Sequence, residues 1–542
     1  MITRAIIIIL AFAAVLSLPY ALRPAREIPP AGALPLVVIS PHMEAIRYEF
    51  EQAFRQWHAA RYGKPVVIDW RIVGGTSEIM RYIESEYVAA FKQHWTATLG
   101  EPWTSEVAAA FSNYRLDAPG AKVTDLQKKA REAFLASSAG IGIDVIFGGG
   151  SFDNDRNARK GYLVDCGLSR MHPEWLAPEI IPQTLGGEVY YDKQGRWYGA
   201  CLTTFGICYN RESLRRLKID KPPTQWSDLA DPKYYKQIGL ADPTKSGSIN
   251  KAYEMLLQQQ IGLEIGERKA RTASWDDAAE KEAIAAGFAR GMRILQRIAA
   301  NARYFTDGAS SVVGDVGDGN AAAGMCIDFY GRVEAESIWQ RGSDRLEYVA
   351  PAGGTTVSVD PIGIFRGAPN FEVAQHFVEF VISPEGQKLW NYKAGTPGGP
   401  VKYSLRRMPI RQDLYTAEHQ RFMSDPNAEP YTIARQMVYH PEWTASLFNF
   451  LRLYFQSMAM DPHGELQEAW RAIIEAGGPD AVPEAAAVMG QMAVPYEKAA
   501  EQNINDPIQR MALTRNWSMS FKKQYEEVRK LARAQRKAAS ND

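Results

Sequence analysis

The chain has 542 residues, too many for one ordinary hydrophobic core, so two or three domains are expected. It carries 62 Lys and Arg residues against 62 Asp and Glu residues, and this balance argues against a nucleic-acid-binding protein, which usually has a basic excess. A hydrophobic content of 46% excludes an intrinsically disordered chain.

The N-terminal segment is strongly apolar. Arg4 precedes an unbroken apolar run over residues 5–16, which is typical of a secretory signal peptide. The apolar stretch 5–22 also approaches the minimum length of a membrane-spanning helix, about 17 residues, so an uncleaved anchor is an alternative. A buried helix in a cytosolic protein is the third interpretation. We expect residues 1–33 to form a signal peptide or membrane anchor followed by a proline-rich linker.

Strand and helix patterns alternate from residue 34 onward. "LVVIS" predicts a buried strand, and the next segment places Ile46, Phe50, Phe54 and Trp57 at helical spacing before a capping Gly63. "PVVIDWRIV" predicts a second strand, and a second helix follows it. This order predicts an α/β domain with a parallel sheet. The polar, helix-rich stretch at about 92–140 interrupts the pattern and is interpreted as an insertion.

Two long extended segments and a helical tail mark the rest of the chain. "GRWYGACLTTFGICYN" (195–210) and "VSVDPIGIFRG" (357–367) are the extended segments, with helices predicted at about 250–301 between them. After residue 414 the strand patterns nearly vanish, and apolar stripes such as Leu447, Phe450, Leu451, Tyr454 and Met458 appear. We expect residues 415–542 to form a helical C-terminal extension that packs on the body.

Small hydroxyl residues and glycines follow four predicted strands. They are Ser40 and His42 in "VVISPH", Gly75, Thr76 and Ser77 in "IVGGTSE", Ser151 in "IFGGGS", and Ser246, Gly247 and Ser248 in "LADPTKSGS". One such serine is an ordinary helix cap. Ligands bind beyond the carboxyl ends of strands in open α/β sheets, where helix starts offer free N–H donors. The repetition therefore predicts a site for a small polar or anionic ligand.

The ordered set of these segments resembles the type II periplasmic solute-binding proteins of ABC importers, in the ferric-iron and phosphorylated-solute branch. The resemblance runs from about residue 35 to 405 and rests on "VVISPH", "GGTSE", "DVIFGGGS", "WYGACLTTFGICYN", "WSDLADPKYYKQIGLADPTKSGS", "AAAGMCIDFYG", "IGIFRGAPNFEVAQHFVEFVISPEGQKLW" and "GGPVK". It implies an α/β fold of two lobes joined by two crossing strands, with the ligand between them. The expected limits are 34–204 for lobe 1, 205–356 for lobe 2, and 357–414 for a return to lobe 1.

The resemblance also suggests where the ligand is held. Ferric-binding members use adjacent tyrosines where this chain has "DFY", so that Phe329 replaces one phenolate and Tyr330 remains. Iron ligands, if the cargo is ferric, would be His42, Glu78 and Tyr330, although for His42 we favour a loop cap first and a contact to another ligand second. A hard ferric ion prefers anionic oxygen donors, so we favour a small anionic solute, with ferric iron plus a bound anion second. The expected contacts are Ser40, His42, Gly75, Thr76, Ser77, Ser151, Thr204, Ser246, Gly247, Ser248, Asp328 and Tyr330.

The implied function is extracytoplasmic capture of a phosphorylated or carboxylated compound, or ferric iron with an anion, and its delivery to an ABC transporter permease. We expect a monomer without a resident cofactor or a nucleic-acid partner, periplasmic or anchored to the membrane. One alternative is an enzyme that uses a cleft cysteine, although Cys166, Cys201, Cys208 and Cys326 lie beside no histidine and are more simply buried hydrophobes. A membrane-tethered ligand sensor is the other alternative.

Overall fold

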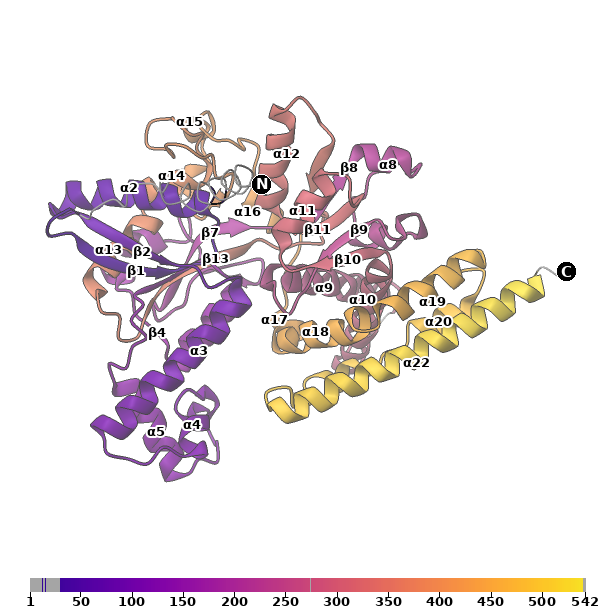
Figure 1. Ribbon diagram of the computed structural model, residues 1–542, viewed down its shortest axis with the longest axis horizontal. Coiled ribbons are helices and arrows are strands. Elements are labelled where there is room, and N and C mark those ends of the chain that lie inside the picture. Colours follow the sequence, from indigo (N-terminus) through magenta and orange to yellow (C-terminus); the bar gives the residue numbers. More distant parts are fainter. Residues whose placement is uncertain (1–11, 13–14, 16–29, 273, 540–542) are drawn as a thin grey trace, which may run out of the picture.

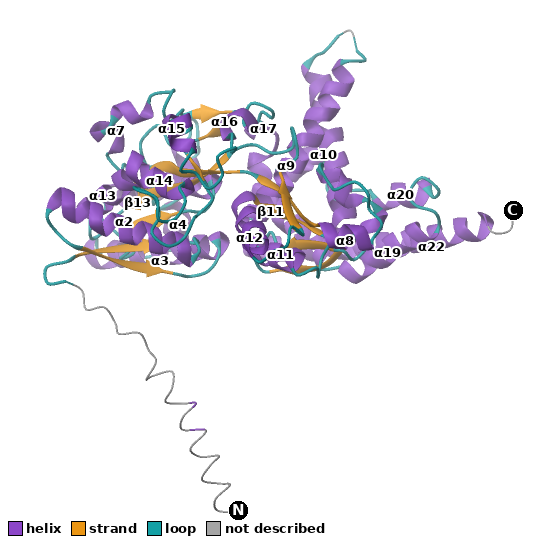
Figure 2. Ribbon diagram, turned by 90° about the horizontal axis from the view of Figure 1, so that it is seen from above, coloured by secondary structure: helices purple, strands orange, loops and turns teal. Residues whose placement is uncertain are grey.

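A computed structural model describes residues 12, 15, 30–272 and 274–539, which build two lobes and a helical C-terminal region (Figure 1). The predicted export segment falls almost entirely outside these residues. Among the residues that are described, no helix has the length and apolar character needed to cross a membrane. Figure 2 shows the two main sheets as separate groups of strands, each with helices around it.

The first sheet defines lobe 1. Its strand order is β14-β7-β13-β3-β1-β2, with β4 beside β13, and β1 pairs in parallel with both β2 and β3. The strands are β1 (Leu34–Ile39), β2 (Val66–Arg71), β3 (Val145–Phe147), β4 (Leu163–Val164), β7 (Trp197–Thr203), β13 (Ser358–Phe365) and β14 (Met408–Pro409). The helices are α2 (Glu44–Tyr62), α3 (Thr76–Gln93), α6 (Ser151–Lys160), α7 (Leu168–Met171), α13 (Phe371–Ile382) and α14 (Pro384–Asn391), with the turns η3 (Pro173–Leu176) and η6 (Gln412–Leu414) and the hairpin β5 (Thr184–Leu185) and β6 (Glu188–Val189).

The local pattern explains how α2 covers this sheet. Ile46, Phe50 and Phe54 recur at helical spacing, and all three are buried. The Phe50 ring lies 5.2 Å from that of Phe147 in β3, and the helix ends at Gly63, whose φ of 67° suits a glycine cap. Full burial of a side chain of this size stabilises the fold by about 1.5–3 kcal/mol. The predicted helix and its end are therefore confirmed.

The second sheet defines lobe 2, with the strand order β10-β9-β11-β8-β12. Its strands are β8 (Phe205–Asn210), β9 (Ile238–Ala241), β10 (Ala302–Thr306), β11 (Ala323–Ile327) and β12 (Leu346–Val349). Its helices are α8 (Arg211–Arg216), α9 (Gly247–Lys269), α10 (Asp277–Ala300), α11 (Ala309–Gly317) and α12 (Asp328–Gln340), with the turns η4 (Trp226–Ala230) and η5 (Pro232–Tyr234). This sheet is mixed, because β9 runs parallel to β10 and β11 whereas β8 runs antiparallel to β11 and β12.

Two passages of chain join the lobes. Only Thr204 separates β7 of the first sheet from β8 of the second, and residues 350–357 return from β12 to β13. The passages are bonded to each other, since the Phe205 amide donates a 3.0 Å hydrogen bond to Thr355 Oγ1. The predicted two-lobed fold is confirmed, with one refinement. The extended stretch at 357–367 pairs within the first sheet as β13, so the return passage comes just before it.

A helical segment follows α3 before the sheet resumes at β3. Helix α3 continues into the π-helical turn η1 (His94–Thr98), and α4 (Ser105–Ala110), the turn η2 (Tyr114–Asp117) and α5 (Asp125–Ala136) follow. The Phe111 ring lies 5.0 Å from Phe91 of α3 and 5.0 Å from Phe134 of α5. These aromatic contacts hold the segment to the far end of α3, away from the start of that helix (Figure 1).

Most of the C-terminal extension packs on lobe 2, whereas its first residues pack on lobe 1, where the Ser424 amide donates a 2.6 Å hydrogen bond to the Asn391 carbonyl oxygen. It comprises α15 (Ala417–Gln420), α16 (Pro430–Ile433), α17 (Pro441–Thr444), η7 (Ala445–Leu447), α18 (Phe448–Phe455), the π-helical turn η8 (Gln456–Met460), α19 (His463–Glu475), α20 (Pro483–Met489), α21 (Tyr496–Ala499) and α22 (Pro507–Ala539). Buried Trp470 donates a 2.8 Å hydrogen bond from Nε1 to Asn301 Oδ1. Buried Gln296 of α10 donates to Tyr525 Oη of α22 at 3.0 Å. The long helix α22 runs along the outer side of α19 and α20 (Figure 1).

Candidate ligand-binding site

A cavity of about 470 Å³ lies between the two lobes. Lobe 1 contributes residues at the starts of α3 and α6, and lobe 2 contributes residues at the starts of α9, α11 and α12. The ends of β7 and β13 next to the connection between the lobes reach it as well, through Thr203 and Ser358. The cavity therefore occupies the place where a change in the angle between the lobes would open or close it.

Five helix N-termini surround this cavity. The lining residues include Gly75 and Thr76 of α3, Gly150 and Ser151 of α6, Ser246 to Ser248 of α9, Gly308 to Ser310 of α11, and Ile327, Phe329 and Tyr330 of α12. Only in α9 does the side chain of the cap residue itself accept a hydrogen bond. At the start of α3, the Glu78 carboxylate accepts from the Gly75 amide instead. First-turn N–H groups have no partner within their helix, and each helix start carries a partial positive charge. This arrangement of helix starts favours an anionic ligand in the cavity.

The starts of α3 and α9 face each other across the cavity. A β-carbon added at Gly247 would lie 3.8 Å from Thr76 Cβ, and one added at Gly75 would lie 3.2 Å from the Lys245 carbonyl oxygen. Ser246 acts as the cap of α9, because its Oγ accepts a 3.4 Å hydrogen bond from the Ile249 amide. Ser248, two residues on, lines the cavity. Both serines therefore line the cavity, and Ser246 also caps the helix.

Eight of the residues expected from the sequence line the cavity. They are His42, Gly75, Thr76, Ser151, Ser246, Gly247, Ser248 and Tyr330. They come from segments more than 280 positions apart in the chain, which the fold brings to one place.

Four other expected residues do not line the cavity because their side chains bond elsewhere. Ser40 Oγ donates to the Phe147 carbonyl oxygen at 2.7 Å, and the Thr204 hydroxyl lies 3.1 Å from the Tyr348 hydroxyl. Asp328 is buried and accepts a 2.8 Å hydrogen bond from Thr203 Oγ1. Ser77 is buried and accepts a 3.2 Å hydrogen bond from Arg452 Nη1. These four residues support the walls and the connection between the lobes.

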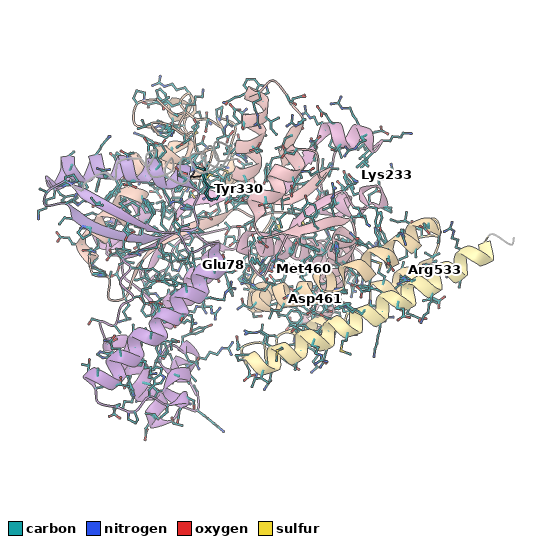
Figure 3. All side chains as sticks on the ribbon, viewed as in Figure 1. Glu78, Lys233, Tyr330, Met460, Asp461 and Arg533 are labelled. Carbon is teal, nitrogen blue, oxygen red and sulfur yellow. The ribbon has the colours of Figure 1, made fainter. Side chains whose placement is uncertain are left out.

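The ferric ligand set is not assembled. Glu78 is absent from the cavity lining, and its Oε2 accepts a 2.9 Å hydrogen bond from the Gly75 amide at the start of α3. Figure 3 shows Glu78 on α3 well apart from Tyr330 on α12. Within the part of the chain that is described, no cluster of three or more His, Cys, Asp or Glu side chains could hold a metal ion.

His42 belongs to a buried charged cluster at the cavity wall. Its Nε2 lies 3.4 Å from Asp360 Oδ2, and Arg407 Nη1 lies 2.6 Å from the same oxygen. Burial lowers the pKa of His42, and the neighbouring Arg407 cation lowers it further despite the opposing effect of Asp360. Burial alone would raise the pKa of Asp360, but Arg407 and His42 hold it below its ordinary value. The guanidinium carbon of Arg407 also lies 4.2 Å from the centre of the Phe329 ring.

Several lining residues were not anticipated from the sequence. Lys251 follows Ser248 by one helical turn, and its Nζ pairs with Glu188 at 3.1 Å and Glu254 at 3.0 Å. Burial alone would lower the pKa of Lys251, but the two carboxylates raise it overall. Asp153, two positions after Ser151, is buried, and burial raises its pKa. The helical spacing of three residues from Ser248 could have suggested Lys251, whereas no such spacing relates Asp153 to Ser151.

The cysteines do not provide a nucleophile at the cavity. All four are buried with free thiols, and none of them lines it. Burial raises the pKa of Cys166 to about 12 and raises those of Cys201 and Cys326 well above the usual value. A nucleophilic cysteine needs the thiolate form, which these environments suppress. The interpretation of the cysteines as buried hydrophobes fits the structure.

The two lobes and the cleft lined by helix starts form the fold that the resemblance implies. Residues 155–415 match the family model of bacterial extracellular solute-binding proteins, which confirms the predicted resemblance over these residues. It is a family of solute-binding proteins and not of enzymes.

Curated relatives and solved structures show more distant similarity. An uncharacterised protein of Haemophilus influenzae is 27% identical over 247 residues, 45% of this chain and 60% of the relative. The phosphoglycerate transport regulatory protein PgtC of Salmonella typhimurium is 24% identical over 272 residues, 50% of this chain and 55% of the relative. The chain thus spans little more than half the length of these relatives.

Among solved structures, the periplasmic binding protein AfuA from Actinobacillus pleuropneumoniae, with fructose-6-phosphate bound, has 18% identity and a TM-score of 0.44, covering 70% of this chain and 85% of AfuA. Iron-bound HitA from Pseudomonas aeruginosa has 15% identity and a TM-score of 0.43, covering 77% and 98%. Similarity at this level does not identify a ligand.

Proposed function

We propose that this chain is an extracytoplasmic solute-binding protein that captures a small organic anion, phosphorylated or carboxylated, between its lobes and delivers it to an ABC importer. The observation that carries the proposal is the convergence of five helix N-termini on one cavity. In four of them, the side chain of the cap residue accepts no hydrogen bond from the helix. Unpaired N–H donors from several helices bind an anion with fixed, neutral groups that need no desolvation of charged side chains.

The size of the cavity favours an organic anion over a bare ion. A volume of about 470 Å³ is within the usual range of small-molecule sites, roughly 300–1,000 Å³. Aromatic side chains at Phe152, Phe205, Phe329 and Phe448 form part of the lining. These apolar walls suit the carbon skeleton of a ligand whose anionic group meets the helix starts. A ferric ion with a small anion would leave most of this space unused.

The charged side chains of the cavity are largely paired, either with each other or with buried residues behind the cavity wall. Lys245 Nζ lies 2.5 Å from Asp307 Oδ1, and Lys251 is paired with two glutamates. Asp360 is likewise paired with Arg407. Recognition therefore rests mainly on neutral N–H and hydroxyl donors. The partial similarity to a phosphoglycerate transport regulatory protein supports a phosphorylated solute as the first candidate.

Native mass spectrometry of the protein from its own cells tests the proposal, because it shows what the cavity carries. Titration calorimetry then compares 3-phosphoglycerate and fructose 6-phosphate with their unphosphorylated counterparts, glycerate and fructose, and with ferric citrate. We expect a phosphorylated or carboxylated compound to bind and fructose not to bind. Binding of ferric iron alone, or of none of the anions offered or carried, would contradict the proposed function.

The proposed location and partners follow from the proposed function. We place the mature protein outside the cytoplasmic membrane, as a monomer that presents its closed lobes to a permease. Uptake of the identified anion by cells with and without the gene tests delivery. Equal uptake, with the N-terminal segment retained in the mature protein, would favour a membrane-tethered sensor.

A further inference from the structure

Helix α18 of the C-terminal extension contacts both lobes at the mouth of the cavity. Lobe 2 holds it from one side, where Asn250 of α9 donates a 2.8 Å hydrogen bond from Nδ2 to the Phe448 carbonyl oxygen. On the other side it reaches lobe 1. The Phe448 ring lies 4.7 Å from that of Phe152 in α6, and Arg452 Nη1 donates to Ser77 Oγ in α3. The helix therefore bridges the cleft.

Arg452 holds an unusual position for a cation. Its Nε and Nη2 atoms are buried and have no hydrogen-bond partner within the part of the chain that is described. Burial lowers its pKa, and the cations Arg156 and Arg81 act in the same direction, while the Asp153 carboxylate opposes them. A buried guanidinium with donors to spare is costly unless something compensates it. Two groups in the structure compensate for the burial of the Arg452 charge: the Ser77 hydroxyl, which accepts its hydrogen bond, and the Asp153 carboxylate, which attracts it. Both groups belong to lobe 1.

The extension also meets lobe 1 beside the connection between the lobes. The Tyr439 amide donates a 2.7 Å hydrogen bond to the Gly186 carbonyl oxygen, next to the β5–β6 hairpin. The Tyr439 hydroxyl donates to Glu254 Oε1 of α9 at 2.8 Å, and Lys251 Nζ lies 3.8 Å from the centre of the Tyr439 ring. The extension thus bridges the lobes near their connection as well as at the cavity mouth.

We propose that α18 is a latch that holds the cleft closed, with Arg452 as a positioning residue on Ser77 and Phe448 as an apolar contact on Phe152. The proposal rests on the proposed function in one respect, since the latch closes over the ligand cavity. Because α18 is fixed to lobe 2 and both contacts lie on lobe 1, separation of the lobes breaks them together. A contact near the connection moves little when the lobes rotate, whereas one at the mouth moves most.

The distance between the lobes tests the latch without any ligand. All four native cysteines are buried, so spin labels can be placed by the changes Ala60→Cys in α2 and Arg215→Cys in α8, both exposed positions. Double electron–electron resonance then measures the distribution of distances between the lobes. We expect the wild-type chain to populate a short, closed distance. Arg452→Gln, Ser77→Ala and Phe448→Ala should each shift at least half of that population to longer distances.

A double-mutant cycle separates the latch from a merely structural role. If Arg452 and Ser77 act through their contact, combining Arg452→Gln with Ser77→Ala should open the cleft no further than either change alone. Arg529→Gln is the matched control, because Arg529 pairs with Glu468 at 2.7 Å within the extension and should leave the distances unchanged. A wild-type chain that is already open, or variants with wild-type distances, would overturn the latch. Failure of every anion to bind would instead count against the proposed function and leave these distances interpretable.

Discussion

Gly75 of lobe 1 faces the Lys245 carbonyl oxygen of lobe 2 so closely that a β-carbon at position 75 would lie 3.2 Å from that oxygen. The φ angle of Gly75 is −74°, so the backbone itself would accept a side chain. The constraint comes from the opposite lobe, because this contact would be closer than a β-carbon normally makes. This pair of residues therefore marks the line along which the cleft closes.

We predict that Gly75→Val prevents full closure, because its branched side chain would collide with the backbone at Lys245. Affinity for the bound anion should fall tenfold or more, equivalent to about 1.4 kcal/mol. Titration calorimetry with the anion identified by mass spectrometry measures this loss. Gly266→Ala is the control, since a β-carbon there meets nothing within 4 Å. Wild-type affinity in the Gly75→Val protein would contradict the assigned line of closure.

Thr76 and Ser248 should each contribute a hydrogen bond to the ligand from opposite sides of the cavity. Thr76→Ala and Ser248→Ala are expected to weaken binding about tenfold or more, since a hydrogen bond to a charged group contributes roughly 1.5–3 kcal/mol. Ser246→Ala should instead lower the stability of the fold by about 1 kcal/mol through loss of the α9 cap. Calorimetry and thermal unfolding distinguish the two effects. Unchanged affinity in both of the first variants would place the ligand elsewhere.

Asp153→Asn should stabilise the protein at neutral pH. Burial raises the pKa of this carboxyl, and the opposing attraction of Arg452 offsets that effect only in part. The native state therefore binds the proton more tightly than the unfolded state, and the ionised form destabilises the fold at neutral pH. The amide carries no such penalty. The gain in Tm should shrink as the pH falls through the raised pKa toward the ordinary value of 3.8. Thermal unfolding at pH 7 and pH 4 measures it. Asp307→Asn, at an exposed carboxyl, should show no such pH-dependent gain.

His42 should make the protein sensitive to mild acid. Its pKa is lowered in the native state, so the unfolded chain takes up the proton first as the pH falls. Its contribution to stability is complete above about pH 6.5 and is lost as the pH falls from that value toward the lower native pKa. Between pH 7.5 and 5.5, His42→Gln should lose less Tm than the wild type. His440→Gln, at a partly exposed histidine, should behave like the wild type, and equal losses in all three proteins would refute the assignment.

Trp470 should anchor the C-terminal extension on lobe 2. Trp470→Ala removes a buried ring and its hydrogen bond to Asn301, with an expected loss of about 3–5 kcal/mol in the free energy of unfolding. Trp339→Ala is the control, because Trp339 is 64% exposed and its loss should change stability by less than about 0.5 kcal/mol. Urea unfolding compares the two. A small effect at Trp470 would mean that the extension is held elsewhere.

Local patterns determined much of this protein. The alternation of apolar strands and amphipathic helices predicted the α/β lobes. Side chains return to the same face every 2 residues in a strand and about every 3.6 residues in a helix, so the two patterns can be told apart in the sequence. The glycine and hydroxyl residues after four strands predicted most of the helix starts around the cavity. The loss of strand patterns after residue 414 predicted the helical extension. Each of these inferences needs only neighbouring residues.

Tertiary structure alone decided which of these residues meet. Thr76 and Ser77 are adjacent, but successive helical side chains point about 100° apart, so Thr76 lines the cavity while Ser77 bonds to Arg452. Ser77 and Arg452 are 375 positions apart, and no periodicity relates them. The same holds for Phe448, which reaches the cavity from the extension. Such contacts depend on how whole helices pack against one another, and that packing is set by the sum of many distant contacts rather than by any local pattern.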